Sequence, residues 1–191
     1  GKELSAELGL GGKTVISLLL GGDTKRYRAE QHTVRTIVET LKRFADRYDC
    51  VLLVTTSRRT RSDIVDLVKE LFSEEPRCKL LVIASESNRP HIIPAMIGTS
   101  RIIMVTEDSI SMISESIQSR KPVMIISLAK KGISKKHLRF QKQLLRDGLI
   151  RHVCENTLYN ILENMLHSSG PRAILDEERN RLEASVRSLL S

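Results

Sequence analysis

An acidic, hydroxyl-rich turn separates an apolar segment from a short amphipathic one over residues 105–116. A helix is expected to begin at Ser109, and a helix N-terminus combines partial positive charge with unpaired backbone N–H groups, which suits a phosphate. Glu115, more than one turn into that helix, could accept hydrogen bonds from the diol of a sugar. The segment therefore predicts one half of a nucleotide-sugar site.

The same turn has a structural interpretation that is compatible with phosphate binding. Asp108 or Ser109 could cap the helix, and its serine-rich face could pack closely against a sheet. Glu107 and Asp108 are adjacent carboxylates, but neighbouring side chains in an extended segment point apart. We therefore do not expect them to act as an acid–base pair, although one of them could orient a sugar.

Two glycines follow the first long apolar segment. Gly21 and Gly22 let the backbone turn sharply and approach a ligand closely, and Asp23 and Lys25 place charge beside them. The pattern matches neither the dinucleotide fingerprint nor the P-loop. A tight turn without a ligand explains the glycine pair equally well.

A second hydroxyl-rich segment, residues 55–60, follows the next apolar run and contains Arg58 and Arg59. Guanidinium groups pair bidentately with phosphate. The alternative is a helix cap at Thr60 or Ser62, with both arginines solvated. Two such segments beside one crevice favour anion binding.

The loop at residues 85–90 follows the third apolar segment and could meet a base through its backbone groups, although an ordinary polar loop explains it equally well. His91 is expected to be a surface or capping residue. The sequence shows no legible Ser/His/Asp, Cys/His or metal-ligand spacing, so we predict no metal site and no cofactor and assign no catalytic residue.

Buried strands alternate with amphipathic helices along the chain. Strands are expected at residues 14–20, 50–55, 79–84, 102–105, 123–127 and 150–153. Helices are expected at 28–48, after residue 60 or 62, near 94–97, from 109, and at 134–146, 157–166 and 176–189. This order predicts an α/β, Rossmann-like doubly wound fold, a mainly parallel six-stranded sheet with helices on both faces. Ligands of such sheets bind beyond the carboxyl ends of the strands, where the polar loops would meet.

The Rossmann-like domain is expected to span residues 13–170. Residues 1–12 are polar and punctuated by glycine, and we interpret them as a linker from a missing N-terminal domain. Residues 171–191 are expected to form a C-terminal helix. The first residue is Gly rather than Met, which suggests a trimmed sequence or a fragment of a longer protein.

The net charge of +8 favours anionic partners such as nucleotides, nucleic acids or acidic lipids. Aromatic residues make up only 3%, which weighs against nucleic acid because single-strand binding relies on stacking rings. The basic block at residues 130–146 is either a solvated helix face or a contact for an anionic membrane or an acidic partner. No apolar run reaches the roughly 20 residues of a membrane span, and no signal peptide opens the chain, so we expect a cytoplasmic protein with optional peripheral membrane contact.

Three of these segments, in this order, resemble a known family. Residues 18–23 (Leu-Leu-Leu-Gly-Gly-Asp), 53–60 (Leu-Val-Thr-Thr-Ser-Arg-Arg-Thr) and 105–115, followed by Lys121 and Pro122, are similar to the mitochondrial fission protein family named for elongated mitochondria. That family is in turn similar to the C-terminal halves of GT-B glycosyltransferases, including the enzyme that adds N-acetylglucosamine to the peptidoglycan lipid. In those enzymes this half holds the nucleotide-diphosphate sugar.

The resemblance implies a role for each matching position. The implied nucleotide and phosphate contacts are Gly21, Gly22, Asp23, Lys25, Ser57, Arg58, Ser109, Ser111 and Glu115, with Glu115 on the ribose hydroxyls. Residues 88–91 are Asn-Arg-Pro-His where family members often have Asn-Pro-Tyr. The identity of the base therefore stays open, and UDP, GDP and ADP are all candidate nucleotides. Some members were labelled epimerases; the absence of a dinucleotide fingerprint and of a Tyr-x-x-x-Lys dyad gives that label no support.

A complete GT-B enzyme has two Rossmann-like domains, and the N-terminal one supplies the acceptor site and often the catalytic base. The chain is therefore expected to be a domain that binds a nucleotide-diphosphate sugar and is catalytically incomplete alone, with a membrane or lipid-linked acceptor as a further partner. The alternative is a non-enzymatic scaffold that binds a protein partner or a membrane through its basic face. A nucleic-acid-binding module is a weaker third option.

Overall fold

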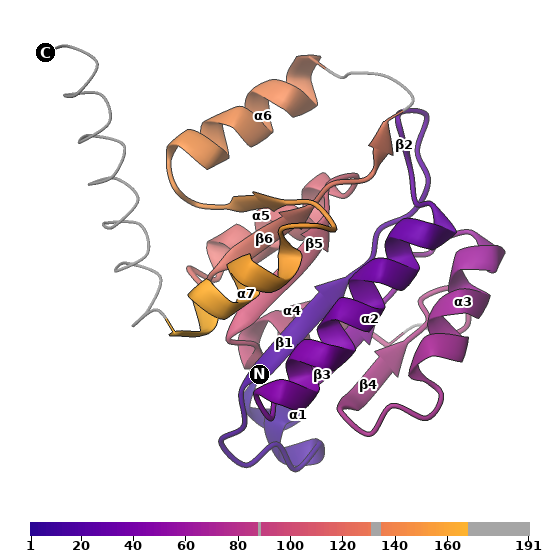
Figure 1. Ribbon diagram of the computed structural model, residues 1–191, viewed down its shortest axis with the longest axis vertical. Helices are drawn as coiled ribbons and strands as arrows, with labels where there is room; N and C mark the ends of the chain where they lie inside the picture. Colours follow the sequence, from indigo (N-terminus) through magenta and orange to yellow (C-terminus); the bar gives the residue numbers. More distant parts are fainter. Residues whose placement is uncertain (88, 131–134, 168–191) are drawn as a thin grey trace, which may run out of the picture.

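A parallel six-stranded sheet forms the centre of the protein in the computed structural model, which describes residues 1–87, 89–130 and 135–167 (Figure 1). Its strands lie in the order β4 (Cys78–Val82), β3 (Val51–Thr55), β1 (Val15–Leu19), β5 (Ile102–Thr106), β6 (Val123–Ile126) and β8 (Arg151–Val153). All neighbouring pairs are parallel. The predicted Rossmann-like sheet is therefore confirmed.

Helices cover both faces of this sheet (Figure 1). One face carries α2 (Gln31–Arg47), α3 (Ser62–Phe72) and α7 (Leu158–His167), and the other carries α1 (Lys2–Glu7), α4 (Ile92–Thr99), α5 (Ile110–Gln118) and α6 (Lys135–Arg146). Because successive strand side chains point to opposite faces, Ile16 and Leu18 of β1 join the α2 side of the core, and Val15 and Leu19 join the α4 side. Within the described residues, no helix is long and apolar enough to cross a bilayer.

The order of the strands determines where a ligand can bind. From β1 the chain moves to β3 and β4 on one side, then returns past β1 to β5, β6 and β8 on the other. A reversal of this kind leaves a crevice at the carboxyl ends of the strands near the switch point. The three polar turns after β1, β3 and β5 all lie at that edge.

The N-terminal segment, expected to be a linker, contains a short helix. Helix α1 spans Lys2–Glu7, and Leu4 and Leu10 are both 3% exposed in the apolar core on the α4 side. Burial of these two leucines removes apolar surface from water and so favours the packing of the segment against the domain. Residues 1–12 thus contact the domain through Leu4 and Leu10, whereas the predicted helix at 171–191 lies outside the described residues.

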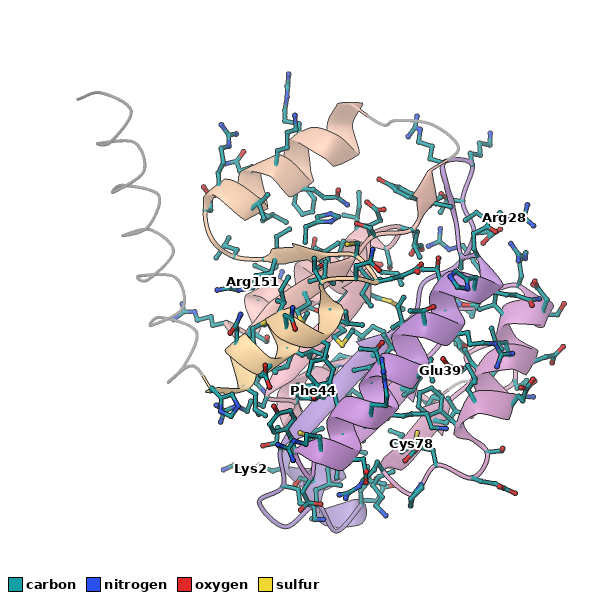
Figure 2. All side chains as sticks on the ribbon, in the orientation of Figure 1. Lys2, Arg28, Glu39, Phe44, Cys78 and Arg151 are labelled. Carbon is teal, nitrogen blue, oxygen red and sulfur yellow. The ribbon has the colours of Figure 1, made fainter. Side chains whose placement is uncertain are left out.

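A small antiparallel ribbon was not predicted. β2 (Tyr27–Arg28) pairs with β7 (Ala129–Lys130), which joins the turn after β1 to the segment after β6. Figure 2 shows Arg28 projecting outward beside this ribbon, in agreement with its exposure. Strands of two residues give no readable periodicity, so the sequence offered no signal for them.

Candidate functional site

A cleft of about 520 Å³ lies at the carboxyl ends of β3 and β4. Three segments that are distant in the sequence form its walls: residues 55–59 after β3, the end of β4 with the start of α4, and the start of α5. The cleft is lined by these residues predicted from the sequence: Ser57, Arg58, Ser109, Ser111 and Glu115. The fold therefore brings three of the predicted polar segments together, because Ser87, Arg89 and Pro90 of the loop at residues 85–90 line the cleft as well.

The β3–α3 loop presents its arginines to the cleft. The Thr60 hydroxyl accepts a hydrogen bond from Ser57 N at 2.9 Å, and Ser57 Oγ accepts one from Arg59 N at 3.0 Å. These bonds close a tight turn in which Arg58 and Arg59 are exposed and both line the cleft. The expected helix cap is not formed, because the N-cap of α3 is Arg61 and it makes no side-chain cap bond.

The N-terminus of α5 forms the opposite wall. The first helical bond runs from Ile113 N to Ser109 O at 3.0 Å, so the N–H groups of residues 110–112 have no partner within the helix. Ser109 occupies the N-cap position without a side-chain cap bond, and its hydroxyl lies 3.5 Å from the Ser111 hydroxyl. The prediction that Asp108 or Ser109 caps this helix through its side chain is therefore wrong.

The glycine pair lies beside the cleft but does not line it. Gly21 N donates to Thr106 Oγ1 at 2.7 Å, and Gly22 N donates to Asp108 Oδ2 at 2.9 Å. A Cβ on Gly21 would overlap the Asp108 carboxylate, and one on Gly22 would overlap the backbone of Arg59. The glycines are thus required for the close approach of three loops, and their amides bind protein groups.

Two other predicted contacts also lie outside the cleft lining. Asp23 accepts a hydrogen bond from Ala29 N at 3.1 Å and forms an ion pair with Arg61 Nη1 at 2.8 Å, so it fixes the turn after β1 to the start of α3. Lys25 is exposed in the same turn. Neither residue is placed in the cleft by this structure.

The two adjacent carboxylates are buried and serve different partners. Asp108 accepts from Gly22 N and lies 3.8 Å from Arg59 Nη2, whereas Glu107 Oε1 accepts from Leu128 N at 2.7 Å. Burial raises the pKa of the Asp108 carboxyl. Residues 107 and 108 form a turn rather than an extended segment, and their carboxylates bind different backbone N–H groups.

The start of α4 adds a surface that the sequence did not reveal. Ile92, Ile93 and Pro94 line the cleft beside His91, which is exposed and sits at the helix N-cap without a side-chain cap bond. Apolar atoms at a cleft wall suit a flat ring. The sequence signalled only a short helical piece here, because a cleft lining depends on distant segments.

The charges in the cleft fit an anion next to a hydroxylated group. Arg58, Arg59 and Arg89 line it, and Arg89 also forms an ion pair with Glu7 of α1. Glu115 is exposed on the same lining and can accept hydrogen bonds. Guanidinium groups and helix N–H donors are groups with which proteins bind phosphate.

Several solved structures share this fold. S. aureus MnaA, solved with UDP, has a TM-score of 0.63 at 12% identity, over 96% of this chain and 48% of that one. The Methanocaldococcus jannaschii UDP-GlcNAc 2-epimerase, in complex with UDP-GlcNAc and UDP, has a TM-score of 0.56 at 15% identity, over 96% of this chain and 49% of that one. The UDP-forming α,α-trehalose-phosphate synthase from Burkholderia vietnamiensis has a TM-score of 0.57 at 13% identity, over 98% of this chain and 47% of that one.

These matches establish a GT-B-type domain fold, and the chain spans less than half the length of each protein. No protein of curated function matches the sequence. The resemblance noted in the sequence is confirmed by a family model that covers residues 2–173. The chain belongs to the family of mitochondrial fission ELM1 proteins.

Proposed function

We propose that the cleft binds the nucleoside diphosphate part of a nucleotide sugar, and that the domain is the donor-binding half of a GT-B-like glycosyltransferase. The observation that supports this most is the meeting of Arg58 and Arg59, the α5 N-terminus and Glu115 around one cleft. Each group suits a different part of such a ligand. Arginines and helix N–H groups suit the diphosphate, and the carboxylate suits a sugar diol.

The apolar start of α4 supports a place for the base. Ile92, Ile93 and Pro94 lie on the same cleft as the phosphate-binding groups, and the adjacent loop offers backbone donors and acceptors. A ring that packs on these side chains would extend its diphosphate toward α5. The relatives that were solved with UDP make a uridine nucleotide the first ligand to try.

The reaction depends on the rest of the enzyme. The similar structures include an epimerase and a synthase, so the fold does not choose between transfer and epimerisation. In a transfer, Arg58 and the α5 amides would stabilise the negative charge on the departing diphosphate. A second domain would bind the acceptor, including a lipid-linked one, and would supply the catalytic base.

Isothermal titration with UDP, GDP and ADP tests the proposal. Arg58→Ala should weaken UDP binding by about 1.5–3 kcal/mol, the value of a charge-assisted hydrogen bond, or roughly tenfold to more than a hundredfold. Lys25→Ala is the matched control, because it removes an exposed cation near the same edge but outside the cleft. Equal losses for both variants, or no binding by the wild type, would contradict the assignment.

The exposed cations of α6 and of the β1–β2 turn favour a second candidate function. Arg139, Lys142 and Arg146 are exposed on α6, and Lys25, Arg26 and Arg28 are exposed around β2, which pairs with the β7 segment that precedes α6. A scaffold could use this basic surface to hold an acidic partner or an anionic membrane at its cytoplasmic side. Charge reversal at Arg139 and Lys142 should abolish salt-sensitive binding to anionic liposomes if this function holds, and should leave UDP binding unchanged.

A further inference from the structure

A buried carboxylate lies against one of the cations of the cleft. The Asp108 side chain is 0% exposed, and its Oδ2 lies 3.8 Å from Arg59 Nη2. Arg59 lines the cleft with a side chain that is 57% exposed. The same guanidinium therefore faces both the buried carboxylate and the space proposed for the diphosphate.

Asp108 is poorly solvated for an ionised group. Its Oδ2 accepts the hydrogen bond from Gly22 N, but its Oδ1 accepts none from any described residue and lies where a Cβ on Gly21 would stand. Burial raises the pKa of this carboxyl, and Thr106, Gly22 and Arg59 offset that effect only in part. An ionised carboxylate in such surroundings depends strongly on a nearby cation.

The other titratable groups near Asp108 do not supply that cation. Glu107 adds a second negative charge in the same turn. Tyr27 of β2 lies near both carboxylates, and the pKa of its phenol is raised first by burial and then by these two charges. Among the described residues, the cation that lowers the pKa of Asp108 is Arg59 of the β3–α3 loop. The state of Asp108 is therefore linked to the position of Arg59.

We propose that Asp108 positions Arg59 in the empty cleft and takes up one proton when a diphosphate binds, which releases the guanidinium to the ligand. This inference rests on the proposed function of the cleft and adds a regulation of the same site by pH. Asp108 is a positioning residue, since it acts on the ligand through Arg59.

The coupling follows from the charges. A bound diphosphate attracts Arg59 away from Asp108 and adds negative charge nearby, and both changes disfavour the ionised carboxylate. A proton from solvent then neutralises the carboxyl, while no bond of the ligand forms or breaks. Because the bound state holds more protons, the affinity rises as pH falls through the pKa of Asp108 in the complex, by at most about tenfold per pH unit.

Titration calorimetry with UDP-N-acetylglucosamine in buffers of different ionisation enthalpy measures this proton uptake directly. In this ligand both ends of the diphosphate are esterified, so it lacks the phosphate ionisation near about pH 6 that would confuse the result. The wild type should take up as much as one proton per ligand and bind more tightly at lower pH. Asp108→Asn should lose the proton uptake that Asp108 contributes.

The two neighbouring arginines provide the control. Arg59→Ala should lose affinity by about tenfold or more and lose the proton uptake, because Asp108 has then lost its cation before the ligand arrives. Arg58→Ala should lose affinity but keep the proton uptake, since Arg58 does not act on Asp108. These variants decide the matter even if Asp108→Asn fails to fold.

The outcomes separate this inference from the proposed function. Tight binding by the wild type without proton uptake, or proton uptake that persists in Arg59→Ala, overturns the role of Asp108 and leaves the nucleotide site standing. A wild type that binds no nucleotide overturns both.

Discussion

Replacing Thr60 by valine should destabilise the fold and loosen one wall of the cleft. The Thr60 hydroxyl accepts from Ser57 N at 2.9 Å and donates to Gly21 O at 2.7 Å, and all three residues are buried. Valine has nearly the same shape, so the substitution leaves one donor and one acceptor unsatisfied. Each costs about 1–3 kcal/mol, and the added methyl group returns roughly 1 kcal/mol. We expect a net loss of about 1–5 kcal/mol from the roughly 5–15 kcal/mol of a typical domain.

Urea denaturation measures this loss as a lower midpoint at an unchanged m-value. Thr60→Ser is the matched control, because it keeps the hydroxyl and removes only a methyl group, at a cost of about 1 kcal/mol or less. The valine variant should also bind UDP more weakly under native conditions, since the turn that presents Arg58 is less fixed. Equal midpoints for valine and wild type would refute the view that this hydroxyl joins the loops after β1 and β3.

Three further substitutions examine other parts of the structure. Gly22→Ala should cost about 1–3 kcal/mol in urea denaturation, because the new Cβ meets the backbone of Arg59 rather than a movable side chain. Leu4→Ala should cost about 2–5 kcal/mol if residues 1–12 are part of the domain, whereas the exposed Lys2→Ala should stay within about 0.5 kcal/mol. The raised pKa of Asp108 means that the folded state holds its proton more tightly than the unfolded state, so the wild type should lose stability relative to Asp108→Asn as pH rises from about 4. Thermal unfolding of both proteins across that range checks the sign, and a constant difference would contradict it.

The sheet was predictable because its strands carry an unambiguous signal. All residues of Ile102–Thr106 are buried, since helices cover both faces, and such a strand appears in the sequence as an apolar run without alternation. Alternation of strands with helices then requires parallel pairing, which places every loop after a strand at one edge. The meeting of residues 55–59 with the α5 N-terminus follows from this topology alone.

The partners of individual polar groups were not predictable in the same way. Thr60 and Asp108 both stand just before helices, where a hydroxyl or a carboxylate usually caps the helix. In the folded chain the closer partners are Gly21 O and Gly22 N, from a turn that is distant in the sequence. That choice depends on how β1 packs between β3 and β5, and no local pattern encodes it. Helix α1 was missed for a similar reason, because Leu4 within it and Leu10 after it are recognisable as core residues only when the surface that they contact is known.

The glycine pair shows how a residue can serve a ligand site that it does not touch. β1 lies between β3 and β5, so its turn separates the loop of Arg59 from the start of α5. With side chains at positions 21 and 22, that turn would push the Arg59 backbone and the Asp108 carboxylate apart. Because positions 21 and 22 carry no side chains, Arg59 and Asp108 come within ion-pair distance across the switch point of the sheet. The glycines therefore act on the cleft through the spacing of its two walls, and the effect of a larger residue there on nucleotide affinity should scale with its effect on stability.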